Sequence, residues 1–149
     1  AQLPTVSAFN AYLASHQMAV TQLAAVYCDS LVQSVTLKTA LFPGFVFNRS
    51  PSSILANEWR AGIVEPLRDR FLNTGLYAVD PGMSAIANIE DEVVDLITST
   101  EIVGAGGDSK RKGLQWCDSA GGGCPPARTN GVVKGACIAV LASGALLIH

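Results

Sequence analysis

The sequence predicts an all-α fold: a four-helix-bundle-like domain with a long Gly-rich loop and two disulfides. Four stretches carry apolar residues three and four positions apart and are separated by proline, glycine and serine. No stretch alternates apolar and polar residues over enough positions to indicate a sheet. The last stretch, from Gly131 to His149, is almost wholly apolar and rich in small residues. Other helices, other subunits or lipid must therefore enclose it. At 149 residues, a single domain spanning 1–149 is expected.

The first predicted helix runs from about Val6 to Ser34, with Pro4 and Ser7 as start signals. Its predicted buried face comprises Phe9, Leu13, His16, Val20, Leu23, Tyr27 and Leu31. A compact loop follows, and its aromatic residues Phe42, Phe45 and Phe47 are expected to pack against the bundle.

The second predicted helix starts at Ser52 or Ser53 and reaches about Leu72. Pro66 lies inside it and is expected to kink or divide it, because proline removes one backbone donor. Its predicted apolar stripe comprises Ile54, Leu55, Trp59, Ile63, Leu67 and Phe71.

The third predicted helix opens at Asp80-Pro81 and ends before Gly104. Its inward residues are predicted to be Ile86, Ile89, Val93, Leu96 and Ile97, and its mostly outward ones Glu90, Asp91, Glu92 and Asp95. Residues 104–127 are expected to form an ordered loop, and the fourth helix runs from near Arg128 to the C-terminus. From Gly135 to Ile148 this helix offers 14 residues, against the roughly 20 apolar residues that a bilayer requires, so no membrane span is expected.

The four cysteines lack the CxxC spacing of a zinc site. Cys117 and Cys124 flank a short Gly-rich loop that can close a local bridge, whereas Cys28 and Cys137 lie in the first and last predicted helices. Of the three possible pairings we favour Cys117–Cys124 with Cys28–Cys137; four buried, reduced thiols are the alternative. Disulfides, and a chain that opens at Ala1-Gln2 as a processed product would, favour a secreted protein, extracellular or at a cell surface.

The composition favours self-association. Charged residues make up only 15% of the chain and the mean hydropathy is +0.32, which leaves too little polar surface for a solitary domain. The net charge of −2 argues against nucleic acid as a partner, because the only basic cluster is Lys110-Arg111-Lys112.

The candidate ligands for a haem or a metal are His16, Met18 and His149, because an up-down bundle brings the start of its first helix and the end of its last helix together. Two histidines without carboxylates make a poor metal site, and CxxCH is missing. A core His16 with a hydrogen-bond partner is the preferred interpretation. The acidic group Glu90–Glu92 with Asp95 lacks the pattern of a calcium loop and is expected to be a solvated helix face. We therefore expect no catalytic residue, cofactor or metal.

Two stretches carry a family resemblance. HQMAVTQLAAVYCDSLV from His16 to Val32, followed by FPGF at Phe42–Phe45, and the segment from Ala127 to His149 resemble the C-terminal module of large secreted bacterial proteins that carry LamG-type, concanavalin-like domains. The resemblance implies an exported bacterial protein in which Cys28 and Cys137 are fixed parts of a helical core. It carries over no functional residue.

The sequence thus predicts a secreted structural subunit that self-associates into an extracellular filament or another homo-oligomer, without catalysis. The alternatives are a cell-surface binding or anchoring module and a helical bundle that binds haem or a metal.

Overall fold

The computed structural model describes residues 6–72, 82–100, 113–117 and 124–147, with the side chains of residues 15–72, 88–100, 113–117 and 124–143. Its elements, in chain order, are α1 (Val6–Gln33), α2 (Val35–Leu41), the 3₁₀ turn η1 (Pro51–Ser53), α3 (Ala56–Trp59), the π-helical turn η2 (Arg60–Val64), α4 (Glu65–Phe71), α5 (Gly82–Thr98) and α6 (Arg128–Leu147). The described part of the chain contains no strand, and the all-α prediction is confirmed.

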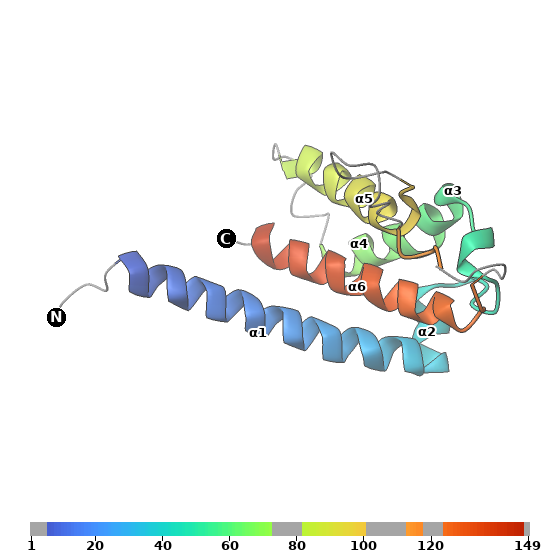
Figure 1. Ribbon diagram of the computed structural model, residues 1–149, viewed down its shortest axis with the longest axis horizontal. Helices are drawn as coiled ribbons and strands as arrows, with labels where there is room; N and C mark the ends of the chain where they lie inside the picture. Colours follow the sequence, from blue (N-terminus) through green and yellow to red (C-terminus); the bar gives the residue numbers. More distant parts are fainter. Residues whose placement is uncertain (1–5, 73–81, 101–112, 118–123, 148–149) are drawn as a thin grey trace.

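Helix α6 lies between the long helix α1 on one side and α4 and α5 on the other (Figure 1). It runs antiparallel to α1: Cys28 is bonded to Cys137, and Lys38 of α2, which follows α1, donates to Asn130, nearer the start of α6. The buried apolar residues of α6, among the side chains that the structure describes, are Val132, Val133, Ala136, Cys137 and Val140. The sequence allowed this helix to be enclosed by other helices, by other subunits or by lipid. Over residues 132–143, the chain's own helices pack against it.

The core is built around the aromatic side chain of Trp59, which is fully buried. Its ring lies 5.5 Å from that of Phe45, and its indole Nε1 donates to Oε1 of the buried Gln115 at 2.9 Å. The other core residues come from every long helix; among them are Leu31, Ile63, Leu67, Val93, Ile97 and Val133. The predicted packing of Phe42, Phe45 and Phe47 against this cluster is confirmed.

The buried face of α1 differs from the predicted one. Ala24, Cys28, Leu31 and Val32 are buried, whereas His16, Leu23 and Tyr27 are exposed. Apolar residues occur on several sides of this helix, so a spacing of three and four can be followed along more than one face. The side that carries Cys28, bonded to α6, is the one that packs inward. Phe9 and Leu13 belong to the part of α1 whose side chains lie outside the described residues.

The second predicted helix exists as the continuous series α3, η2 and α4, preceded by η1. The predicted effect of Pro66 takes the form of a π turn: Glu65 N–H donates to Arg60 O, five residues back, and Pro66 is the second residue of the regular α4 that follows. The wider turn accommodates a residue that has no N–H to donate. Ile54, Trp59, Ile63 and Leu67 are buried as predicted, but Leu55 is 65% exposed and the prediction for it is wrong.

Helix α5 buries Val93 and Ile97 as predicted, together with Val94. Leu96 is exposed, against the prediction. Ile86 and the predicted start at Asp80-Pro81 lie outside the described residues or side chains. After α5, backbone N–H groups of Gly113, Leu114 and Gln115 donate to the carbonyl oxygens of Ser99, Leu96 and Ile97. This short segment of the Gly-rich loop therefore caps the end of α5; most of the rest of that loop lies outside the described residues.

Candidate functional site

Both predicted disulfides, Cys28–Cys137 and Cys117–Cys124, are present, and the four-thiol alternative is wrong. Cys28 and Cys137 are fully buried and join α1 to α6 across 109 residues of sequence. Beside them Lys134 pairs with Asp29 at 2.9 Å, so this contact between α1 and α6 has both a covalent and an ionic link.

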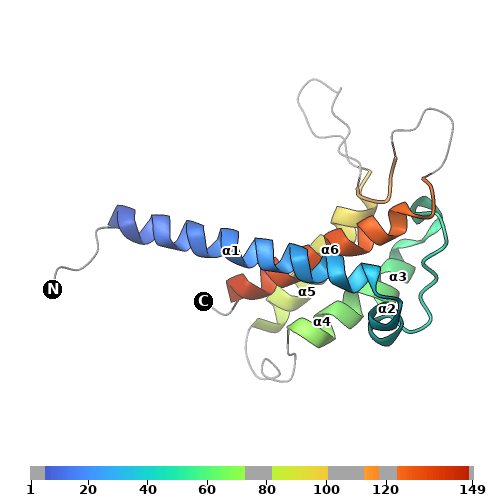
Figure 2. The ribbon, with the colours of Figure 1, turned by 90° about the horizontal axis from the view of Figure 1, so that it is seen from below.

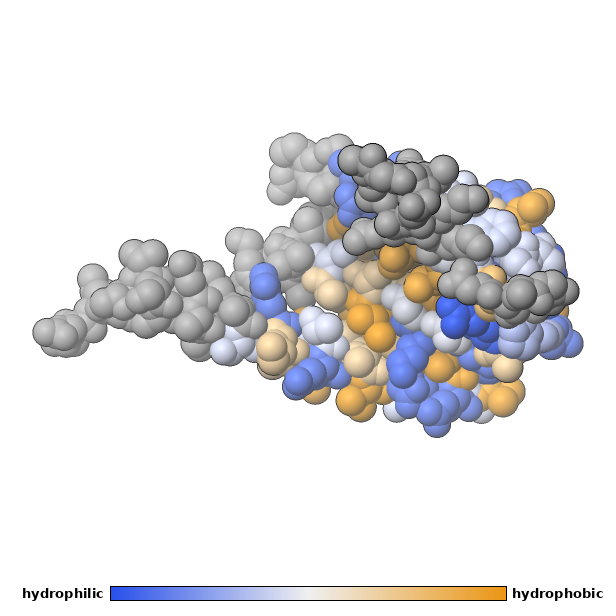
Figure 3. Space-filling model, viewed as in Figure 1, coloured by the Kyte–Doolittle hydropathy of each residue, from blue (hydrophilic) through white to orange (hydrophobic). Residues whose placement is uncertain are grey.

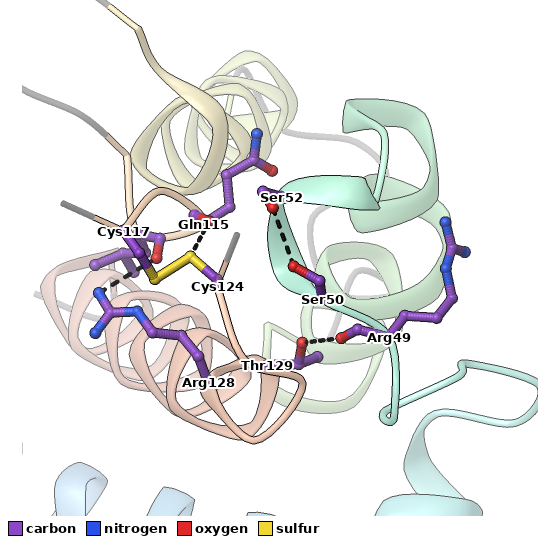
Figure 4. The surroundings of a disulfide bond; sticks show 9 residues. Arg49, Ser50, Ser52, Gln115, Cys117, Cys124, Arg128 and Thr129 are labelled. Atoms are coloured by element: carbon purple, nitrogen blue, oxygen red, sulfur yellow. Dashed lines mark hydrogen bonds between the residues drawn. A yellow bond between two sulfur atoms is a disulfide. The ribbon is translucent and has the colours of Figure 1, made fainter. Parts of the chain in front are cut away.

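The Cys117–Cys124 disulfide lies where the loop meets the start of α6 (Figure 4). Thr129, buried in the first turn of α6, donates to the carbonyl oxygen of Arg49 at 2.6 Å. The Arg49 side chain in turn donates to Glu58, and with the backbone N–H of Leu55 it holds the pKa of that carboxyl below its usual value. These contacts hold the loop and α6 against the segment around η1. Their role is structural, and they do not form an open binding site.

The candidate haem or metal ligands are not brought together by the described structure. His16 and Met18 are both exposed on α1, and His149 lies outside the described residues. The interpretation of His16 as a core histidine is therefore wrong. Within the ranges that the structure describes, no group of three or more His, Cys, Asp or Glu residues lies close enough to hold a metal ion.

The acidic group on α5 is only partly a solvated face. Glu90 is 8% exposed, and its carboxylate pairs with Arg68 from α4 and, at 3.6 Å, with Arg60 from η2. Asp91 is exposed and pairs with Arg60 at 2.6 Å. Glu90 thus links α5 to the neighbouring helices, and the outward prediction for it is wrong. The basic cluster Lys110-Arg111-Lys112 lies outside the described residues.

The main uncovered apolar surface of the described chain lies on α1. Leu23 is 71% exposed and Val26 68% exposed, and with Ala19 and Ser30 they follow one another at intervals of four, three and four residues. We name Ala19, Leu23, Val26 and Ser30 the outer stripe of α1. This alternation of three and four is the spacing at which one helix packs along another in a coiled coil. Figure 3 shows apolar side chains reaching the surface among polar ones on one side of the molecule.

The helix that carries the outer stripe is also without charge over most of its length. From Ala1 to Cys28 the sequence contains no Asp, Glu, Lys or Arg; Asp29 is the first. The absence of charge before Asp29 can be seen in the sequence itself, but the apolar periodicity of the same residues predicts a buried face for α1. An apolar helix without charges can be either buried or an interface, and only the placement of its neighbours decides between them.

The N-terminal part of α1 projects beyond the rest of the described chain (Figure 2). Because Cys28 lies beside Cys137 and both helices rise about 1.5 Å per residue, the end of α6 at Leu147 is level with about residue 18 of α1. The residues of α1 before that level have no companion helix from α6.

An open groove of about 560 Å³ lies toward the other end of α1, between α1, α2 and α4. Its walls include Tyr27 and Leu31 from α1, Leu37 and Leu41 from α2, and Pro66 with the charged Asp69 and Arg70 from α4. Tyr27 is held edge to face against Phe71, with ring centroids 5.6 Å apart. Tyr27, which lines the groove, lies one helical turn from Leu23 of the outer stripe.

No family of proteins, no curated protein and no solved structure matches this chain. In the described parts of the chain, we find no helix that combines the length and the apolar character needed to cross a membrane.

Proposed function

We propose that this chain is an extracellular structural subunit that self-associates through the outer stripe of α1. The observation that carries the proposal is the exposure of Leu23 and Val26, together with Ala19 and Ser30, at coiled-coil spacing on a helix that carries no charge before Asp29. An exposed apolar stripe of this kind marks a surface that is covered in the working state.

A second copy of the chain is the partner that this surface fits. Two copies of α1 can meet along residues 6–28 without taking a charged side chain out of water, whereas a charged partner would find no opposite charge on residues 1–28 to pair with. The small side chains of Ala19 and Ser30 allow two helices to approach closely between the larger Leu23 and Val26. The low overall charge of the chain, 15%, supports the same proposal.

The two disulfides support an oxidising compartment, in which such bonds form and persist. The resemblance to the C-terminal module of large secreted bacterial proteins supports export as well. Repeated contacts between helices stabilised in this way would form a homo-oligomer or a filament, and the function would be packing rather than chemistry.

The substitution Leu23→Glu tests the proposal. It places a carboxylate in the centre of the outer stripe, and we expect association to weaken roughly 100-fold, because burying the unpaired charge costs about 3 kcal/mol. Sedimentation velocity over a range of concentrations measures the effect, and the thermal unfolding midpoint should stay near that of the wild type because Leu23 is exposed.

Leu55→Glu is the matched control. Leu55 is exposed to a similar extent, 65% against 71%, but lies beside α3 rather than on α1. It should associate as the wild type does. If both variants associate as strongly as the wild type, the outer stripe is not the contact and the proposal is wrong.

A further inference from the structure

The two disulfides of the chain differ in their access to solvent. Cys28 and Cys137 are fully buried between α1 and α6. Cys117, in contrast, is half-buried, and the segment that follows its partner Cys124, residues 125–128, is exposed. Disulfide exchange begins with the attack of a thiolate on a disulfide sulfur and therefore requires access to the bond. In the folded protein, an attacking thiolate can reach the Cys117–Cys124 bond but not the bond between α1 and α6.

Arg128 brings a positive charge to the accessible bond. Its side chain reaches back from the start of α6 toward Cys117 (Figure 4), and its guanidinium donates to Leu114 O at 3.5 Å. A cation in this position attracts an incoming thiolate. It also favours the thiolate form of a cysteine, and a stabilised thiolate is released faster from a mixed disulfide. Arg128 therefore assists both the attack on Cys117 and its later release.

Cys124 has an acceptor in place for the proton that it gains on reduction. Its Sγ atom lies 3.2 Å from the carbonyl oxygen of Gln115 (Figure 4). A disulfide sulfur carries no proton, so this contact is not a hydrogen bond in the oxidised protein, whereas a cysteine thiol can donate one. The contact therefore stabilises the reduced form of Cys124 without a movement of the chain.

The chain on each side of the disulfide is held by contacts that do not depend on it. Backbone N–H groups of residues 113–115 donate to the end of α5 and hold the segment that ends at Cys117. After Cys124, the first turn of α6 donates to the carbonyl oxygens of Pro125 and Pro126. Both thiols should therefore stay within reach of each other after reduction, so that the bond can form again.

We propose that Cys117–Cys124 is a redox-active disulfide that exchanges with a dithiol, while Cys28–Cys137 is a purely structural bond. This inference is independent of self-association through the outer stripe.

The exchange proceeds in two steps. A thiolate of the dithiol bonds to Cys117 Sγ, the bond between the two cysteines breaks, and Cys124 leaves and takes up a proton. The second thiolate of the dithiol then closes its own disulfide and releases Cys117 beside Arg128. The dithiol is oxidised by two electrons, and the cysteine pair gains these two electrons and, as two thiols, two protons.

Reduction of the native protein with dithiothreitol, followed by alkylation with iodoacetamide and peptide mass spectrometry, tests the proposal. We expect Cys117 and Cys124 to be alkylated roughly 100-fold faster than Cys28 and Cys137, because only the first pair is accessible. The fluorescence of the buried Trp59 should show that the protein stays folded during this reaction. A sample freed of dithiothreitol before alkylation should recover the Cys117–Cys124 bond.

Arg128→Gln tests the contribution of the positive charge. We expect this variant to be reduced roughly three- to tenfold more slowly than the wild type, because its disulfide lacks the neighbouring cation. Arg128→Lys keeps the charge and should be reduced nearly as fast as the wild type. Arg70→Gln is the matched control, since it removes the same charge from an exposed position on α4. It should be reduced at the wild-type rate.

Equal rates of reduction for the two disulfides would overturn the proposal, and so would a Cys117–Cys124 bond that opens only in urea. If Arg128→Gln and Arg70→Gln are reduced equally fast, the role assigned to Arg128 is wrong.

Discussion

Gly113 lies where the loop after α5 returns to the end of that helix. Its N–H donates to Ser99 O at 2.7 Å, and a Cβ at this position would stand 2.3 Å from the carbonyl oxygen of Ile97. Backbone approaches backbone here, so no side chain can move aside to make room. The glycine therefore permits the loop to cap α5 and places Gln115 where it accepts from Trp59.

Gly113→Ala is expected to destabilise the fold by about 2–3 kcal/mol, because the added methyl group forces the loop away from α5. Chemical denaturation, followed by the fluorescence of the buried Trp59, measures the loss. The matched control is Gly131→Ala in α6, where nothing lies within 4 Å of the added atom. That variant should gain about 0.5 kcal/mol from its better helix propensity. Equal stability of the two variants would contradict the capping role of residues 113–115.

Glu90 shows at the scale of one residue where sequence patterns fail. It is the first of three consecutive acidic residues, and nothing in the sequence separates it from Asp91 or Glu92. Its burial depends on Arg68 and Arg60, which come from elements more than twenty residues earlier. A carboxylate can be buried only where such partners exist.

At the scale of elements, the helices themselves are the part of the fold that periodicity and punctuation predict. The extents of α1 and α6 agree with prediction to within a residue or two at the ends that the structure describes. The buried side of α1 differs from the predicted one. Apolar residues lie on several sides of this helix, so its orientation is decided only when α6 packs against Cys28. The candidate site was missed for the same reason: Leu23, placed in the core by its spacing, is one of the most exposed apolar residues of the described chain.

Pro66 gives a second example at this scale. Proline in a helix predicts a disturbance, but not its form. The chain keeps its helical course by widening one turn at Arg60–Val64, and the adjacent residues Ile63 and Val64 of that turn are both buried. The form of the disturbance is decided by the packing of that turn, which the sequence alone does not reveal.

The link between α1 and α6 depends on the Cys28–Cys137 disulfide. Replacing both cysteines by alanine is expected to destabilise the protein by roughly 4–5 kcal/mol in the chain-entropy model, because the bond closes a loop of 109 residues. Replacing Cys117 and Cys124 instead opens a loop of only 7 residues and is expected to cost roughly 2–3 kcal/mol. Urea denaturation of the two double variants measures the difference.

The same two variants give a second measurement, since α1 carries the proposed contact surface, the outer stripe. Loss of the long-range disulfide should also reduce assembly, whereas loss of the local one should leave assembly near the wild-type level. If the two double variants are equally stable and assemble equally well, α1 does not depend on its bond to α6.

At the scale of the whole molecule, the chain divides its apolar residues between two places. One set forms a core around Trp59 that the chain's own helices complete. The other lies along α1, where the outer stripe and the groove remain open in the single chain. Low charge in the composition predicted that some surface would need cover. The apolar C-terminal helix suggested α6 as that surface; the structure instead exposes Leu23 and Val26 of α1, while the described part of α6 packs against the chain's own helices.

The mass of the purified, oxidised protein as a function of concentration tests the self-association of α1 most directly. Sedimentation velocity should show species at multiples of 15.5 kDa that grow in proportion as the concentration rises. A single species of 15.5 kDa at every concentration, with both disulfides intact by non-reducing mass spectrometry, would contradict the account.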